Sequence, residues 1–263
     1  MILKIRARVG FGRPCNAGCA TALMDELKEK NGLKIIYEDN HLLVLSKPAG
    51  LLAVPDSTGD DSLLDLAKAY IKKTRGKPGN VFLGVVHRID RPVSGLVCFA
   101  KTSKAASRLS KQMRAHAIQK TYLALTKGTP AHENGIFEHM LKKNRAKNVV
   151  ELFPMGTKEA ETRPARTLWR VIKKKNDIYL LELTPETGRP HQLRSQCARM
   201  GLPILGDVKY GAPAPLADGS IALHAFRLAL DHPTKKDRLL FEAPLPSLAL
   251  WQGLVSACKA QGD

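Results

Sequence analysis

The sequence predicts an α+β domain with a mixed, mostly antiparallel β-sheet at its core and helices on its flanks. Three observations favour this fold class. Apolar runs of strand length occur in pairs joined by turn residues, which is typical of β-hairpins. Segments with apolar residues at helical spacing fall singly between these pairs, unlike the regular strand–helix alternation of a doubly wound sheet. No linker between residues 33 and 250 divides the 263-residue chain.

The predicted domain opens with a β-hairpin and a capped helix. Residues 33–50 contain two apolar runs around a polar turn at 38–40. The next segment starts with Ser62 and Asp65, which are spaced as a capping box, and Gly76 supplies a stop signal. Apolar residues recur at helical spacing between these signals, so the segment is predicted to be a helix.

The middle of the chain is predicted to form strands around an exposed loop. Residues 81–86 and 95–101 are short apolar runs, and they place residues 88–94 in the loop that joins two strands. Residues 103–116 predict a helix with one apolar stripe and a basic face, and 121–126 predict another strand. Loops held by rigid strands often carry functional residues.

The last part of the chain predicts a hairpin, a helix and the final strands. Residues 167–185 are typical of a hairpin that turns at 176–177. Residues 188–201 predict a helix, because a proline falls in its first turn and a glycine at its end. Residues 221–233 are expected to supply the last strands, and a closing helix is expected from Ser247 onward.

The charge of the chain indicates a polyanionic partner. Lysine and arginine number 42 against 24 acidic residues, which gives a formal net charge of +18. A surface this basic attracts nucleic acid or an anionic membrane. No apolar run approaches the roughly 20 residues of a membrane-spanning helix, and no basic amphipathic helix with bulky apolar anchors is evident. Nucleic acid is therefore the preferred partner, and no membrane is expected.

The cysteines favour a reducing compartment. The chain has five of them, an odd number at scattered positions, so no disulfide framework is predicted. Cys15 and Cys19 lack a second pair and a nearby histidine, and they are interpreted as ordinary thiols. The first 24 residues are basic like a transit peptide but have few serines and no amphipathic period. A bacterial-type cytoplasmic location is the preferred prediction.

Asp90 stands out because it is the only carboxylate between Leu66 and His132, a stretch rich in lysine and arginine. Arg88 and Arg91 lie on either side of it. An aspartate in such a loop can simply cap a turn, and the spacing alone leaves that interpretation open beside a functional one. No second carboxylate cluster or Cys/His pair completes a metal site, so none is predicted.

Two further stretches bear on whether Asp90 caps a turn or has a function. Tyr122, two residues after Lys120, lies in a predicted strand, where an aromatic residue is commonly half-buried packing. Arg189, His191, Gln192 and Arg194 crowd into the start of a predicted helix. Such a cluster is often a solvated helix end. Positive charge at a helix N-terminus nevertheless opposes the helix dipole, and it calls for an anion nearby.

Seven stretches, in order along residues 33–246, resemble the motifs of the RluA branch of the pseudouridine synthases. They are "YEDNHLLVLSKPAGLL", "HRIDRPVSGLVCFAK", "KTYLAL", "ELTPETGRPHQLR", "GLPILGDVKYG", "LHAFRL" and "FEAPLP". The resemblance implies the catalytic fold of that family for residues 33–263. Residues 1–32 would then be a short extension, too few for the S4-type RNA-binding domain that some members carry.

The resemblance also implies functional residues. The aspartate of the family's H-R-[LI]-D motif falls on Asp90, the tyrosine of K-x-Y on Tyr122, and the arginine of H-Q-[LI]-R on Arg194. These three are the predicted catalytic residues. The predicted RNA-binding residues are Arg88, Arg91, Lys120, Arg189, His191 and Gln192.

The implied reaction converts uridine to pseudouridine in ribosomal RNA or tRNA, without a cofactor or metal, in a monomer. The carboxylate of Asp90 could attack the sugar, remove a sugar proton to open a glycal route, or add to the base, and the sequence leaves these routes open. Tyr122 is expected to stack on a flipped base, and Arg194 to pair with Asp90 and keep it ionised.

Some positions depart from the family pattern, and two other functions are weighed against it. "RPVSG" lacks the usual acid or threonine, Pro190 replaces a common threonine, Gln196 replaces a usual histidine, and "LLAVP" lacks the usual histidine. A non-catalytic RNA-binding protein would not need Asp90, Tyr122 and Arg194 all intact. A metal-dependent nuclease is disfavoured because a carboxylate cluster is missing.

Overall fold

The computed structural model of the chain describes residues 29–30, 33–76 and 79–255. The Cys15–Cys19 pair and the basic first 24 residues lie outside this part. The strands are β1 (Glu29–Lys30), β2 (Leu33–Glu38), β3 (Leu42–Lys47), β4 (Gly84–Val85), β5 (Ser94–Ala100), β6 (Gln119–Lys127), β7 (Asn134–Asn144), β8 (Val149–Phe153), β9 (Arg163–Lys175), β10 (Ile178–Pro185), β11 (Leu223–Asp231) and β12 (Arg238–Glu242). The helices are α1 (Leu63–Arg75), α2 (Ser103–Arg114), α3 (Gln192–Arg199), the 3-10 turn η2 (Val208–Tyr210) and α4 (Ala249–Val255).

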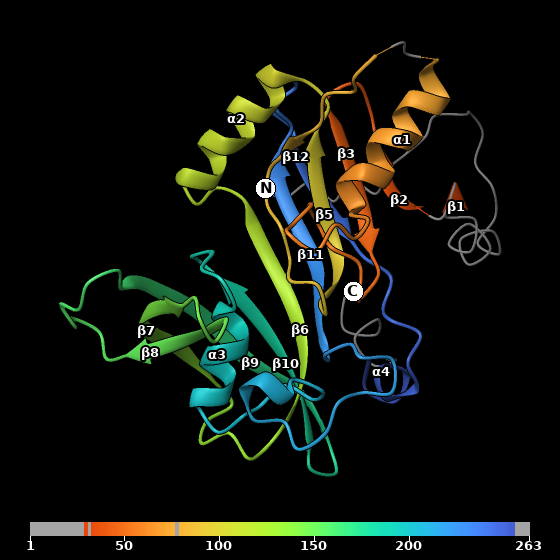
Figure 1. Cartoon of the computed structure of the whole chain (residues 1–263). Helices are drawn as coiled ribbons and strands as arrows, with labels where there is room; N and C mark the ends of the chain where they lie inside the picture. The colour runs from red at the N-terminus through yellow and green to blue at the C-terminus, as the bar shows by residue number, and fades with distance from the viewer. Residues whose placement is uncertain (1–28, 31–32, 77–78, 256–263) are drawn as a thin grey trace.

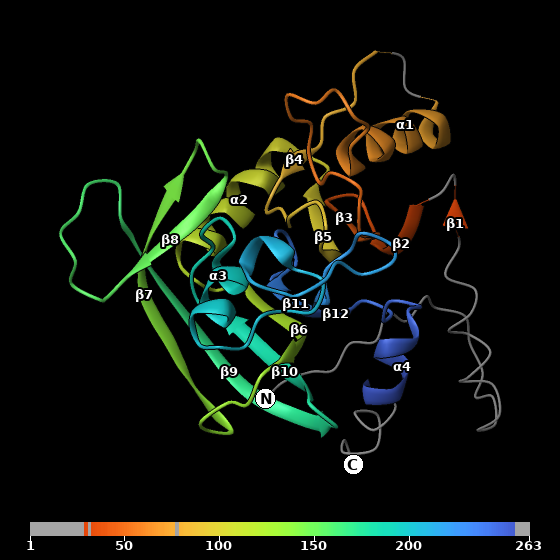
Figure 2. The same cartoon turned by 60° about the horizontal axis from the view of Figure 1, so that its bottom comes forward.

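The described strands join one mixed sheet in the order β1-β2-β3-β5-β11-β6-β10-β9-β7-β8, with β12 on β11 and β4 on β5. Among these strands only β5 and β11 pair in parallel. Figure 1 shows β6 running from the end of α2 into the lower half, where β7 to β10 and α3 lie. In Figure 2, α4 lies on the right below α1, and β7 and β8 lie on the opposite, left side of the molecule. The predicted α+β class is confirmed.

The pair β3 and β5 is buried on both faces, which explains why both strands are almost continuously apolar. Leu43 opposes Phe99 across the pair, and this row packs with α1. Leu42 and Leu96 point to the other face, where α2 contributes Leu109. Alternate residues of a strand face opposite sides, so one strand serves two cores. Each such side chain contributes roughly 1.5–3 kcal/mol on burial.

Local signals explain the helix ends. Ser62 accepts from the backbone of Asp65 and the Asp65 carboxylate answers the backbone of Ser62, so the predicted capping box is present. Gly76 closes α1 in a left-handed conformation with φ 57°. The hairpin of β9 and β10 turns at residues 176–177, where Asn176 has φ 57°.

Several predicted boundaries were wrong. Only Gly84–Val85 of the 81–86 run pairs in the sheet, and β7, β8 and β12 were not predicted as strands. The helix predicted over 188–201 begins at Gln192, because His191 before it has left-handed backbone with φ 47°. None of the described helices is long and apolar enough to cross a membrane.

Candidate active site

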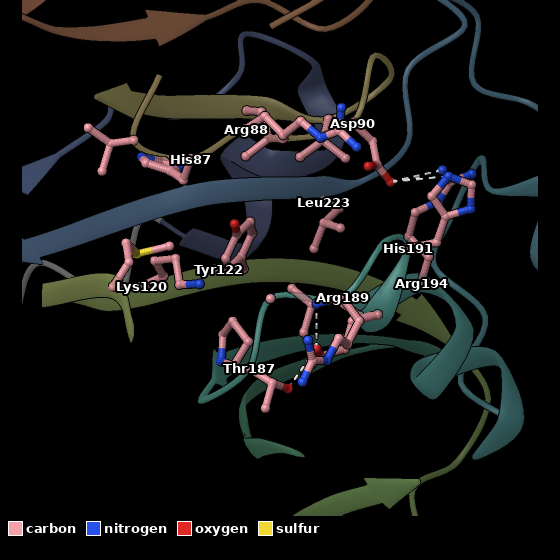
Figure 3. A pocket seen from close by; sticks show the side chains of 18 residues that line it. His87, Arg88, Asp90, Lys120, Tyr122, Thr187, Arg189, His191, Arg194 and Leu223 are labelled. Atoms are coloured by element: carbon pink, nitrogen blue, oxygen red, sulfur yellow. Dashed lines mark hydrogen bonds and ion pairs between the residues drawn. The ribbon is translucent and has the colours of Figure 1, made fainter. Parts of the chain in front are cut away.

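All of the predicted site residues except Arg91 surround one cavity of about 310 Å³. The walls come from the loop before β5, from β6, from the end of β10 and from α3. Figure 3 shows Asp90, His191 and Arg194 at one end, His87 and Lys120 at the other, and Tyr122 and Leu223 between them. Arg91 turns away, with its Nε on the carbonyl of Gly50 and its Nη1 2.7 Å from Asp60.

Asp90 lies in the loop between β4 and β5, held there by backbone contacts. Its carbonyl accepts from the amide of Val93 at 3.1 Å, which closes a turn. Gly95 ends the loop with φ 116°, and a Cβ there would lie 2.3 Å from the carbonyl oxygen of Ala225. Glycine is therefore required where β5 meets β11. The Asp90 side chain stays 30% exposed and faces the cavity.

Arg194 connects Asp90 to a second carboxylate. Its Nη1 donates to Asp90 Oδ2 at 3.1 Å, and its Nε and Nη2 donate to the two oxygens of Asp207 at 2.7 Å each. The predicted pair with Asp90 is present, but the two-point bond goes to Asp207, whose side chain is 1% exposed. Burial disfavours the charge of Arg194, yet the hydrogen bonds and charge of Asp207, with Asp90, raise its pKa.

The anions that were predicted to lie near the positively charged N-terminus of α3 are present. Arg194 lies in the first turn of α3, where the helix dipole disfavours positive charge, and Asp207 and Asp90 offset this. The guanidinium also lies 5.1 Å from the ring centre of Tyr210. Asp207 and Tyr210, both from the 207–210 turn, fix the direction in which Arg194 presents Nη1 to Asp90.

His191 adds a neutral ring beside Asp90. Burial lowers its pKa and outweighs the opposing charge of Asp90, with Arg194 lowering it further. Its Nδ1 lies 2.8 Å from the hydroxyl of Tyr210, which already accepts from the amide of Val150. We assign the hydroxyl hydrogen to Nδ1, so the ring carries its own proton on Nε2. That Nε2 lies 4.0 Å from Asp90 Oδ2.

Tyr122 and Lys120 project from β6 into the same cavity. Burial, and secondly the charge of Asp90, raise the pKa of Tyr122, so its phenol stays protonated. Burial lowers the pKa of Lys120. No hydrogen bond or ion pair joins the side-chain amino group of Lys120 to another described residue. Its amino group is available to a bound molecule.

The remaining predicted RNA-binding residues differ in whether their side chains are exposed or already hydrogen-bonded within the protein. Arg88 is exposed at the cavity mouth. Arg189 donates from Nε to the carbonyl of Pro164. Gln192 is buried, and its amide accepts from Thr187 and the backbone of Arg189 while donating to the carbonyl of Arg166. Gln192 therefore shapes the 187–192 loop, and its amide is occupied within the protein.

A sequence model of the RNA pseudouridylate synthase family matches residues 41–199 of the chain. The chain belongs to this family. Asp90, Tyr122 and Arg194 all fall inside the matched range, whereas Asp207 and Tyr210 lie just beyond it. The resemblance drawn from the motifs is confirmed.

Relatives in the pseudouridylate synthase family cover most of the chain. It is 34% identical over 223 residues to ribosomal large subunit pseudouridine synthase D of Nitrosomonas europaea, covering 81% of this chain and 62% of that protein. It is 34% identical over 229 residues to an uncharacterized RNA pseudouridine synthase of Bacillus subtilis, covering 85% of this chain and 72% of the relative. The chain thus spans somewhat less than two thirds of the length of the Nitrosomonas relative.

Solved structures of the family share the fold. Human RNA pseudouridylate synthase domain containing 4 superposes with a TM-score of 0.67 at 24% identity, over 81% of this chain and 88% of that one. Human RNA pseudouridylate synthase domain containing 1 gives 0.63 at 24% identity, over 81% and 84%.

Sequence reasoning missed Asp207, Tyr210 and Lys47 as site residues of this synthase-family chain. Asp207 and Tyr210 stand in the turn-rich "GDVKYG", which by itself carries no chemical signal. Buried Lys47 donates to the carbonyls of Pro48, Leu51 and Arg91 at 2.7–3.0 Å, which ties the loop after β3 to the Asp90 loop. Burial lowers the pKa of Lys47 to about 7. Its only sequence signal was a lysine before a proline turn.

Two other observations bear on the chemistry of the site. His87 Nε2 accepts from the amide of Cys98, which leaves Nδ1 protonated and without a partner inside the described structure. Within the described ranges, no three His, Cys, Asp or Glu side chains come together as a metal site would require.

Proposed function

We propose that this protein is an RNA pseudouridine synthase that isomerises a uridine in a structured RNA, with Asp90 as its catalytic carboxylate. One observation carries the proposal: the Asp90 carboxylate meets the Arg194 guanidinium at 3.1 Å inside a cavity that Tyr122 also lines. The cavity volume of about 310 Å³ is at the small end of ligand sites, which suits one flipped nucleotide.

The reaction is an isomerisation and needs no external reactant. The C1′–N1 bond breaks, the uracil turns, and C1′ bonds to C5; C5 gives up its proton and N1 gains one. Asp90 can act by attacking C1′, by removing the C2′ proton, or by adding to the base. Deuterium at C2′ distinguishes the second route, because only that route breaks the C2′–H bond and slows with the heavier isotope.

The surrounding residues have separate roles in the proposal. A base inside a helix must leave its stack before reaction, and the face of Tyr122 holds it. Arg194 holds the Asp90 carboxylate in position through the hydrogen bond from its Nη1. His191 presents Nε2–H on the same side as Asp90, where it donates to the sugar or base. Lys120 and Arg88 contact phosphates, which position the RNA without reading sequence.

Ribosomal RNA is the first substrate to test, and tRNA the second. Support for ribosomal RNA is the name of the Nitrosomonas relative, a ribosomal large subunit synthase, at 34% identity. The net charge of +18 suits either RNA. The protein acts in the cytoplasm, as a monomer and without a cofactor, in this proposal.

The deciding experiment maps pseudouridines in total RNA from cells with and without the gene. Loss of a single modified position, restored by the wild-type gene and not by Asp90→Asn, supports the proposal and identifies the substrate. Purified protein should then modify that RNA in the presence of EDTA. An unchanged pseudouridine map, together with RNA binding by the purified protein, would leave the non-catalytic RNA-binding function instead.

A further inference from the structure

A second cavity, of about 670 Å³, adjoins the candidate active site. Both cavities are lined by Pro185 and Thr187, so they share a wall at the end of β10. The second one is enclosed by the start of β6, by β7, by β9 and by Met155 in the loop after β8. None of its residues was among the predicted site residues.

The lining of this cavity keeps large apolar side chains in contact with solvent. Met155 is 52% exposed and Leu168 of β9 is 38% exposed. Ile118, just before β6, adds a buried apolar side chain to the same lining. Contiguous exposed apolar surface beside a polar site is a mark of binding surfaces.

Arg166 provides a flat cation in the same lining. Its Nε donates to Glu138 Oε1 at 2.9 Å and its Nη1 contacts Glu186, so two hydrogen-bonding edges of the guanidinium are already occupied. The carbonyl of Glu186 can only accept, so His116 donates to it from Nδ1 at 2.6 Å. With two carboxylates around one guanidinium, the cavity disfavours a phosphate. The Arg166 side chain is 40% exposed, which leaves guanidinium surface on which a flat group can stack.

We propose that this cavity is a subsite for the base of a nucleotide that flanks the target uridine in the same RNA. This inference rests on the proposed function and extends it to the neighbouring nucleotide. Unpaired bases bind proteins by stacking on apolar side chains or on arginine planes. Base amino and imino groups are donors, which the oxygens of Glu138 and Glu186 can accept. An RNA strand leaving the first cavity past Thr187 reaches this surface directly.

The test uses a synthetic RNA stem-loop that carries the uridine identified by mapping. Each of the three nucleotides on either side is replaced in turn by an abasic ribose, and kcat/KM for pseudouridine formation is measured. The variants are Leu168→Ser and Met155→Ser. Ile136→Ser is the matched control, because Ile136 pairs with Leu168 across β7 and β9, is 47% exposed and does not line the cavity.

One flanking position should be sensitive. Removing its base should lower kcat/KM of the wild type about tenfold, as expected for the loss of one stacked base. On the intact RNA, the kcat/KM of Leu168→Ser should also be about tenfold lower than that of the wild type. Removing the flanking base should then lower the kcat/KM of this variant little further. Ile136→Ser should behave like the wild type, and thermal melts confirm that each variant is folded.

Two outcomes would overturn the subsite. In the first, the wild type modifies the intact RNA, but no abasic position shows an effect that depends on Leu168 or Met155. In the second, Ile136→Ser loses as much as Leu168→Ser, which would indicate a general effect of the sheet face or a protein partner there. Either result leaves the proposed function standing. The proposed function itself is refuted by a different result, an unchanged pseudouridine map in cells without the gene.

Discussion

The buried pair of Arg194 and Asp207 makes the sharpest prediction, because Asp207→Asn changes almost no volume. The variant keeps one acceptor for Arg194 but removes the charge that compensates a buried guanidinium. Breaking a buried ion pair costs about 3–5 kcal/mol when its other half stays charged. Asp90 at 3.1 Å still offsets part of the charge, so we expect the lower end, about 3 kcal/mol.

The effect should be visible in a melting experiment. For a domain of this size, about 3 kcal/mol corresponds to a fall in Tm of roughly 6–12 °C. The matched control is Asp60→Asn, which breaks the Arg91–Asp60 pair of the same 2.7 Å length. Both partners of that pair are about half exposed, and such pairs contribute roughly 0–1 kcal/mol.

A double variant tests whether the two residues act through each other. Arg194→Met should also destabilise the fold, since it leaves Asp207 buried without its partner. The double variant, Arg194→Met with Asp207→Asn, should lose much less stability than the sum of the losses in the two single variants. Turnover of Asp207→Asn should also fall, by up to about 10²-fold, because Asp90 is less well aimed. If Asp207→Asn melts no lower than Asp60→Asn, the account of this pair is wrong.

Further predictions concern chemistry, charge and pH. Asp90→Asn should keep the fold and RNA affinity but reduce pseudouridine formation more than about 10³-fold, measured in single turnover; a near-normal rate would exclude Asp90 as the catalytic group. Arg194→Lys should recover only part of the rate lost in Arg194→Met, since a lysine cannot donate to both carboxylates in the same plane; full recovery would show that charge alone matters. Log affinity for RNA, measured by fluorescence anisotropy, should fall linearly with log salt by about 0.7–0.9 per phosphate contacted, and a flat line would contradict electrostatic binding. Burial lowers the pKa of His224 to about 4, and burial with the charge of Lys120 lowers that of His87 to about 3. Histidine in the unfolded chain titrates near 6.5, so below that pH the unfolded chain binds more protons than the folded one. As the pH falls from about 6.5 to the folded pKa, each of these histidines should lower the free energy of unfolding by about 1.4 kcal/mol per pH unit. Urea unfolding at pH 7 and pH 5 measures this loss, which should shrink in His224→Gln if the explanation is right.

The elements that the sequence predicted correctly depend on neighbours along the chain. The capping box of Ser62 and Asp65 starts α1 and Gly76 ends it, as the spacing indicated. Turn residues 176–177 likewise set the β9–β10 hairpin. These signals are local hydrogen bonds and backbone preferences, which a short segment carries wherever it folds.

Among the strands that were missed, β7 depends on a partner far along the chain, whereas β8 and β12 pair with the strands that precede them. About half of residues 134–153 are polar, and only Phe137, Leu141 and Val150 of β7 and β8 become buried. β7 pairs with β9, about 30 residues further on, and β8 in turn pairs with β7. Pairing across such a distance is set by the sheet as a whole, and a weak local pattern cannot predict it.

For the candidate site, the sequence by itself determined the chemical groups, and only the tertiary structure decided where they point. Asp90 and Arg194 were identified from motifs, and their contact at 3.1 Å spans about 100 residues of chain. Gln192 and Arg91 stand beside them in those motifs, yet one turns inward to the 187–192 loop and the other outward to Asp60. In the sequence, nothing distinguishes Asp207 from an ordinary turn aspartate, whereas in the structure it is buried in an ion pair with Arg194. The reason is physical: a buried charge must find its partner in space, and that partner is chosen by packing and not by spacing along the sequence.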